Sequence, residues 1–200
     1  MFYETAANRH GLSHDPFKAI VSPRPIGWIG SQAKDGSYNL APYSFFNAIS
    51  DTPKLVMFSS SGHKDSVANI EETGEFTASF VSRDLAEKMN LTSLNAPRGE
   101  SEFEIAGLTP AVGTLVAAPF VAEAYAALEC KVTERFQPKT LTGDLSENYV
   151  VIGQVVGIHI REEAIREGRF DMAKVRPVAR MGYMDYCDGG DVFEMFRPRR

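Results

Sequence analysis

Two long segments of this 200-residue chain have the residue pattern of β-strands. Apolar and polar residues alternate in segment 127–136, so one face of an extended strand carries Leu128, Cys130, Val132 and Phe136 and the other Glu129, Lys131, Thr133 and Arg135. Segments 148–160 (NYVVIGQVVGIHI) and 54–59 (KLVMFS) are apolar enough for central strands, and 76–80 (FTASF) alternates again. Irregular turns rather than helices of regular length separate these segments. We therefore expect an all-β fold with added helices, whose antiparallel sheet closes into a barrel.

Two segments predict helices. Segment 64–74 offers Asp65 or Ser66 as a cap and Gly74 where a helix usually stops. Segment 82–94 begins with a serine cap and an early aspartate. Its apolar face would carry Leu85, Met89 and Leu94. We expect these two helices to be additions to the barrel.

The charge and composition of the chain limit its partners and its location. With 21 Lys and Arg against 26 Asp and Glu, the net charge is −5, and apart from a C-terminal RPRR the basic residues are scattered. This pattern argues against nucleic acid and against anionic membrane as partners. No stretch is long and apolar enough for a membrane span, and the N-terminus lacks the features of a secretory signal. We expect one domain over residues 1–200, located in the cytoplasm.

The chain lacks the usual catalytic and metal-binding motifs. It has no GxSxG nucleophile elbow, no HExxH, no Walker loop and no GxGxxG. The four histidines have no ligand-like spacing, so we expect no metal site and a structural role for His159. Cys130 and Cys187 lie far apart and suit reduced thiols, with Cys130 as a buried small hydrophobe.

Polar and small residues gather instead in three turns. Segment 59–66 (SSSGHKDS) leads into the start of a helix, where hydroxyls, backbone N–H groups and a lysine would suit a phosphate. Segment 39–44 (NLAPYS) supplies further hydrogen-bonding side chains, and in segment 23–31 (PRPIGWIGS) Gly27 would permit the close approach of a flat ligand. The alternatives are an ordinary capped turn for the first and a packed barrel corner for each of the others.

Several motifs in order resemble one family. The chain is similar to the flavin reductase-like FMN-binding split-barrel family over about residues 17–186, in the motifs PRPIGWIGS, DGSYNLAPYSFFNAISDTPKLVMFS, SGHKDSVANIEETGEFTASFV, EFEIAGLTP, ALECKV, YVVIGQVVGIHI and RPVARMGYMDY. The resemblance implies a six-stranded antiparallel split β-barrel that forms a homodimer and binds FMN near the dimer interface.

The resemblance also implies which residues contact FMN. Pro25 to Trp28 would flank the flavin, and Asn39 to Phe46 would form its main cradle. Ser61, Lys64 and Ser66 would meet the phosphate. The full predicted set is Arg24, Pro25, Ile26, Gly27, Trp28, Asn39, Leu40, Ala41, Pro42, Tyr43, Ser44, Phe46, Ser59, Ser60, Ser61, Lys64, Asp65, Ser66 and Arg180.

One departure from the family bears on catalysis. Members often carry Gly-Asp-His before the penultimate long strand, whereas TGDLSENYVVIG has Asp144 with no neighbouring histidine. We therefore expect no catalytic acid or base, since orientation alone can serve hydride transfer to a flavin.

Three hypotheses for the function follow. The first is an NAD(P)H-dependent FMN reductase, with the irregular excursion around 90–103 closing over the flavin. The second is a non-enzymatic FMN electron carrier in the manner of flavoredoxin, reduced by a partner protein. The third keeps the barrel but binds another flat ligand such as haem. An oxygenase or an electron-transfer protein would be the further partner.

Overall fold

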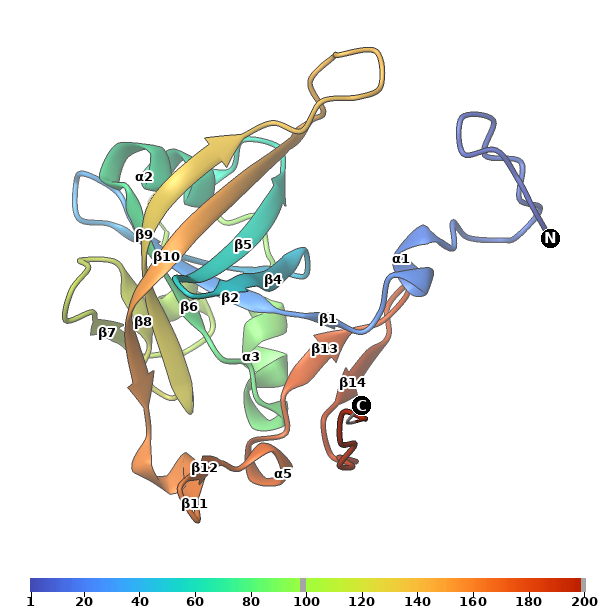
Figure 1. Cartoon of the computed structure of the whole chain (residues 1–200). Helices are drawn as coiled ribbons and strands as arrows, with labels where there is room; N and C mark the ends of the chain where they lie inside the picture. Colours follow the sequence, from blue (N-terminus) through green and yellow to red (C-terminus); the bar gives the residue numbers. More distant parts are fainter. Residues whose placement is uncertain (98–99, 199–200) are drawn as a thin grey trace.

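The main sheet has seven antiparallel strands. The computed structural model describes residues 1–97 and 100–198. The strands run in the order β3-β2-β6-β9-β10-β5-β4, and Figure 1 shows that the sheet curls strongly. Their bounds are β2 Gly27–Gln32, β3 Tyr38–Tyr43, β4 Phe46–Asp51, β5 Lys54–Ser61, β6 Glu75–Ser79, β9 Ala126–Phe136 and β10 Asn148–Ile160. The predicted all-β class with added helices is confirmed.

The sheet is a barrel that stays split. Strands β3 and β4 form its two edges, and no ladder joins them within the described residues. Only the two-residue connection Ser44–Phe45 links them along the chain. The main sheet thus has seven strands rather than the predicted six. The segment from Asn39 to Phe46, expected to be one continuous cradle for the flavin, is divided between the two edge strands β3 and β4.

The two long predicted strands form a hairpin, β9–β10. Strand β10 has the predicted bounds, and β9 begins one residue earlier than predicted. Glycine at 153 is required here, since a Cβ would lie 2.5 Å from the ring of Phe76, which is fully buried in the barrel. Cys130 is also fully buried, as predicted, and burial raises the pKa of its thiol to about 12.

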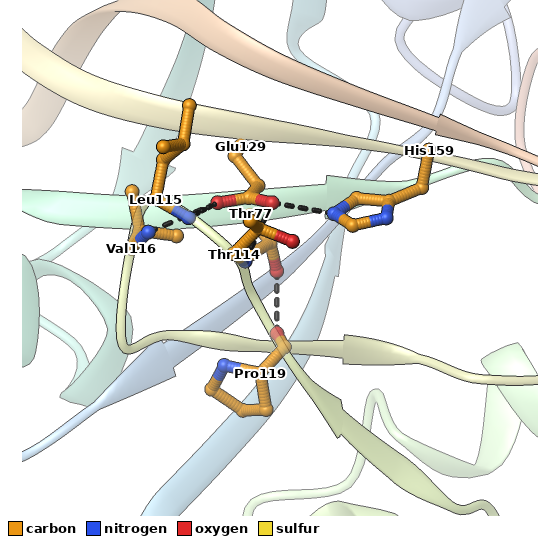
Figure 2. A network of polar contacts seen from close by, with 7 residues as sticks. All are labelled: Thr77, Thr114, Leu115, Val116, Pro119, Glu129 and His159. Carbon is orange, nitrogen blue, oxygen red and sulfur yellow. Dashed lines mark hydrogen bonds and ion pairs between the residues drawn. The ribbon is translucent and has the colours of Figure 1, made fainter.

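The polar face of β9 is covered at Glu129, whereas Lys131, Thr133 and Arg135 on the same face are exposed. Glu129 is only 1% exposed because segment 113–121 lies over it. As Figure 2 shows, its carboxylate accepts hydrogen bonds from the backbone N–H groups of Thr114 (2.8 Å), Leu115 (2.6 Å) and Val116 (2.9 Å). Its other contact is His159 Nε2, which agrees with a structural role for that histidine. These four groups, which we call the Glu129 network, attach the segment to the barrel.

Two short strands form a hairpin here: β7 (Pro110–Val112) precedes this segment, and β8 (Pro119–Val121) is its last part. Gly30 on β2 lets β8 approach, since a Cβ there would lie 1.9 Å from the Pro119 carbonyl oxygen. The same oxygen accepts a hydrogen bond from the Thr77 hydroxyl (Figure 2). Side-chain contacts rather than a backbone ladder thus hold β8 against the main sheet.

The first predicted helix is present, with a different cap. Helix α2 (Asp65–Thr73) ends at Gly74, whose φ of 74° is left-handed, as expected for a helix stop. The cap position is Lys64 rather than Asp65 or Ser66, and no side chain caps the helix. The reason is that Ser66 Oγ accepts a hydrogen bond from Asn39 Nδ2 instead.

The second predicted helix is shorter than expected. A 3₁₀ turn, η1 (Arg83–Leu85), leads into α3 (Ala86–Leu91). Leu85 and Met89 are buried as predicted, but Leu94 is exposed, so that assignment is wrong. The helix ends before it because Thr92 Oγ1 donates to the Met89 carbonyl (2.7 Å) and accepts from Trp28 Nε1 (2.9 Å).

The irregular excursion after this helix contains elements that the sequence did not predict, the short helix α4 (Glu102–Ile105) and strand β7. Phe103 of α4 joins Trp28 and Met89 in a second apolar core beside the barrel. The remaining elements are α1 Phe17–Ile20, β1 Arg24–Pro25, η2 Glu162–Ala164, β11 Ile165–Arg166, β12 Arg169–Phe170, α5 Met172–Val175, β13 Val178–Arg180 and β14 Tyr186–Asp188. Among the described residues, no helix is long and apolar enough to cross a membrane.

Candidate functional site

A cavity of about 300 Å³ lies where segment 39–44, which forms strand β3 rather than the predicted turn, meets the predicted turn 59–66. One wall is edge strand β3 and another is the start of α2. The third is the segment that follows α3. We call it the cradle cavity, and its lining residues are Asn39, Ala41, Pro42, Tyr43, Lys64, Asp65, Ser66, Thr92, Ser93, Leu94, Asn95, Ala96 and Glu102.

A buried hydrogen bond joins the first two walls. Asn39 Nδ2 donates to Ser66 Oγ at 2.8 Å, and both side chains are buried. Alternation along β3 makes this possible, since it turns Asn39 toward α2. This bond holds the edge strand against the start of the helix.

Tyr43 lines the cavity and carries a buried hydroxyl group. The residue is 8% exposed, and its hydroxyl makes no hydrogen bond of normal geometry with any described residue. Burial raises the pKa of Tyr43, and the nearby hydroxyls of Ser66 and Ser60 offset only part of this rise. A buried polar group without a partner is rare, so this hydroxyl, enclosed beside the cavity, is a candidate donor to a ligand.

The start of α2 suits an anion. The helix has nine residues and no side-chain cap, so its first backbone N–H groups and its positive dipole end are available. Lys64 and Ser66 stand beside them. Among the described residues that line the cavity, Lys64 alone is cationic.

Glu102 closes the cavity on the side of α4. Its carboxylate accepts the backbone N–H of Leu40 at 2.9 Å, and the residue is 7% exposed. Burial raises the pKa of Glu102, and the charge of Asp65 adds to the rise. The side chain thus ties α4 to the edge strand, in the position that a neighbouring strand would take.

Comparison with known proteins shows the family of the chain. A family model described as flavin reductase like domain matches residues 21–180. The chain belongs to the flavin reductase-like family. An uncharacterized protein of Aquifex aeolicus is 37% identical to it over 169 residues, which cover 82% of this chain and 83% of that protein.

Two solved structures resemble this flavin reductase-like chain over nearly its whole length. Nitrilotriacetate monooxygenase component B from Bacillus cereus has a TM-score of 0.88 and 28% identity, covering 98% of both chains. The 2-nitrobenzoate 2-nitroreductase of Pseudomonas fluorescens has a TM-score of 0.85 and 28% identity, covering 99% of this chain and 96% of that one.

The first predicted segment of this flavin reductase-like chain does not line the cradle cavity. The Trp28 side chain is fully buried in the second core, and Ile26 and Leu40 lie in the same core. Pro25 is exposed on β1. A Cβ at Gly27 would lie 2.4 Å from the Phe46 ring, so the flat group that approaches Gly27 in this structure is a side chain of the protein itself.

Arg24 is buried among carbonyl groups. Its guanidinium contacts the carbonyls of Lys18 and Val21 and donates to that of Met181 at 2.8 Å. Burial, with the charge of Arg180, lowers the pKa of Arg24. The contacts tie the segment before β1 to the end of β13.

The remaining predicted residues lie beside the cradle cavity or apart from it. Ser60 donates to the Gly62 carbonyl (2.9 Å) and Ser59 accepts from Asn148 Nδ2 (3.1 Å), so both have partners in the protein. Ser61 is exposed and Ser44 half-buried in the turn between β3 and β4. Arg180 lines a different and larger cavity.

Sequence reasoning missed residues 92–96 and Glu102 as parts of this cavity. The excursion that contains them was expected to cover the flavin, but no single residue in it was selected. The short polar run TSLN was a usable signal, because such residues suit hydrogen bonds to a ligand. Nothing in the sequence marked Glu102, whose partner Leu40 lies 62 residues earlier.

Proposed function

We propose that this flavin reductase-like chain binds FMN in the cradle cavity and reduces it with NADH or NADPH. One observation carries the proposal: the cavity unites two of the predicted FMN-binding segments and has hydrogen-bonding capacity that the protein does not use. That capacity consists of the Tyr43 hydroxyl and the uncapped start of α2. Ligand sites usually combine such a concave shape with a few unpaired polar groups.

The residues present fit a flavin phosphate and its polar chain. The phosphate would lie at the start of α2, held by Lys64, by the Ser66 hydroxyl and by helix N–H groups. The ribityl hydroxyls and the ring edge would meet β3 from Asn39 to Tyr43. Since Asp65 and Glu102 also line the cavity, Lys64 supplies the electrostatic attraction for the phosphate.

Bound FMN supplies the hydride-accepting centre of the reaction. The chain's own part is to hold and orient the cofactor and to exclude water from it. We assign no side chain as acid or base, in line with the missing Gly-Asp-His histidine. Fixed orientation of two reactants can by itself account for a large part of a rate enhancement.

We further propose that the chain acts as one domain, in a homodimer, and passes electrons to an oxygenase. The N-terminal segment 1–16 extends away from the barrel (Figure 1). Its first residues are exposed and apolar, and so are Val192, Phe193, Met195 and Phe196 near the other end, at 59–84% exposure. A second copy would cover such surface. The likeness to a monooxygenase component supports the oxygenase partner.

The experiment is a titration of purified protein with FMN, followed by NADH or NADPH without oxygen. We expect quenching of flavin fluorescence at one FMN per subunit and then bleaching of the flavin absorbance. Bound flavin that neither nucleotide bleaches would favour the electron carrier. Absence of flavin binding, or a haem spectrum, would contradict the proposal. Light scattering that gives a stable monomer at micromolar concentration would contradict the dimer.

A further inference from the structure

A second cavity, of about 740 Å³, lies between the η1–α3 helix and the β13–β14 hairpin. We call it the hairpin cavity. Its lining is Arg83, Ala86, Glu87, Met89, Asn90, Leu91, Val178, Arg180, Met184, Tyr186, Cys187 and Asp188. It shares no lining residue with the cradle cavity, because residues up to Leu91 face one and residues from Thr92 face the other. The hydrogen bonds of Thr92 to Trp28 and to Met89 hold this partition in place.

The floor of the hairpin cavity is apolar. Met89 and Val178 are buried parts of the second core, and Ala86 packs against that core. Leu91 and Met184 extend the apolar surface toward the opening, where both are exposed. A floor of this kind favours a ligand with a hydrophobic, ring-sized body.

One wall carries an arginine whose position is fixed. The Arg180 guanidinium lies over the Tyr186 ring at 4.5 Å from its centroid. It also contacts the Tyr186 hydroxyl and the Tyr183 carbonyl. A guanidinium has five N–H donors in a rigid fork, and these two oxygens take only part of them. The pair therefore presents an aromatic surface together with oriented, charged donors.

A second arginine of the lining, Arg83, is only loosely paired. Asp188 accepts a hydrogen bond from Arg176 at 2.8 Å, whereas the ion pair from Arg83 Nε to the same carboxylate is long, at 3.8 Å. The bond from Arg176 and the charges of Arg176 and Arg83 lower the pKa of Asp188 despite some burial, so this carboxylate stays ionised. Glu87 is the remaining acid of the lining. Arg83 and Arg180 together favour an anion.

We infer that the hairpin cavity binds a planar aromatic ring that carries an anionic group. The ring would lie on the apolar floor beside Tyr186, and the anion would accept hydrogen bonds from Arg180 and Arg83. Two sources have this chemistry: the adenine and phosphate portion of a dinucleotide, and a small aromatic carboxylate. The inference does not require flavin in the cradle cavity.

Calorimetric titration of the flavin-free protein tests this site. The probes are NADP⁺ and 5′-AMP for the nucleotide source and benzoate for the aromatic acid, with adenosine and benzamide as uncharged counterparts. We expect saturable binding either of the two nucleotides or of benzoate. The matching uncharged compound should bind about tenfold or more weakly, which is the equivalent of one charge-assisted hydrogen bond. Nucleotide binding without benzoate binding assigns the first source, and the reverse assigns the second.

Arg180→Gln and Arg83→Gln should each weaken binding of the anionic probe by about tenfold and leave binding of the uncharged probe unchanged. Arg83 is largely exposed, so its variant should fold even if loss of Arg180 perturbs the hairpin. Arg161→Gln is the matched control, since Arg161 also lies over a tyrosine ring, Tyr125, at 5.9 Å but outside the cavity. No binding of either anion, or equal weakening by the control, would overturn the inference.

Discussion

Glu129 and Glu102 are both buried glutamates, yet their surroundings differ sharply. Glu129, at 1% exposure, accepts three backbone N–H groups and contacts His159. Burial alone would raise its pKa, but these donors outweigh burial and lower it. Glu102, at 7% exposure, accepts the N–H of Leu40, and burial keeps its pKa raised. The fold thus stabilises the ionised form of Glu129 and disfavours the ionised form of Glu102.

The same contrast holds for the two regions around them. In the Glu129 network, the carboxylate accepts hydrogen bonds from three backbone N–H groups of segment 113–121, which lies over it (Figure 2). The cradle cavity instead keeps an unpaired Tyr43 hydroxyl and an uncapped helix start. Because native proteins rarely leave buried polar groups unpaired, the difference separates a structural polar cluster from a binding site.

The largest expected effect is that of Glu129→Ala on stability. The substitution leaves three backbone N–H groups without their acceptor, and since each unsatisfied buried donor costs about 1–3 kcal/mol, a loss of about 3 kcal/mol or more is expected. Urea denaturation measures the change. Glu75→Ala is the control, since Glu75 accepts a single N–H, from Ala117 at 2.5 Å, and should cost only about 1 kcal/mol. Equal losses of stability in the two variants would contradict a special structural role for Glu129.

Lys64→Ala should change ligand affinity and leave stability nearly unchanged. Loss of one charge-assisted contact to the phosphate is expected to weaken FMN binding by about ten- to a hundredfold. Riboflavin lacks the phosphate and should lose little affinity in the variant. If fluorescence titration shows riboflavin weakened as much as FMN, Lys64 is structural and the phosphate lies elsewhere.

Tyr43→Phe should shift stability and affinity in opposite directions. Removal of an unpaired buried hydroxyl should raise the free energy of unfolding of the flavin-free protein by about 1 kcal/mol. Loss of a hydrogen bond to the ligand should weaken FMN binding by roughly three- to tenfold. Thermal unfolding with and without FMN measures both. A variant that is less stable without FMN would show that the hydroxyl has a partner in the protein.

The two glutamates should make smaller contributions to the pH dependence of stability. Stability should rise with pH below 4.5, the ordinary pKa of a glutamate, because of Glu129, and fall with pH above it because of Glu102. The folded pKa of Glu129 is lowered, so its stabilisation is present above 4.5 and is lost as pH falls through the folded pKa. The folded pKa of Glu102 is raised, so stability declines as pH rises from 4.5 through that value. Glu102→Gln should remove the decline above 4.5 and keep the acid loss. Denaturation at a series of pH values tests this, and an unchanged profile in the variant would contradict it.

The smallest expected effect is that of His159→Gln on turnover. His159 lines neither the cradle nor the hairpin cavity, so nicotinamide oxidation should stay within a few-fold of the wild-type rate. The rate should also vary little between about pH 6 and 8, where an essential histidine would leave an inflection. A variant that binds FMN normally but has lost nearly all turnover would give this region a catalytic role.

Local patterns were enough to predict four of the seven main-sheet strands, β5, β6, β9 and β10, and the end of α2. Alternation of apolar and polar residues repeats every two residues, so it is visible without knowledge of the fold, and β10 has the predicted bounds. Gly74 ends its helix for an equally local reason, its left-handed backbone. The family motifs predicted the split barrel, and two of the three polar segments do meet in one cavity.

The sequence by itself thus determined the four predicted strands, the position of α2 and the apolar face around Cys130, because these depend on neighbouring residues. Only the tertiary structure decided what lies over each face. Alternation correctly placed Glu129 opposite Cys130, but segment 113–121 covers it, and the backbone N–H groups that donate to its carboxylate lie 13–15 positions away. Trp28 reaches Thr92 across 64 positions. Whether a polar group is paired or free for a ligand depends on such distant atoms, and no local pattern encodes them.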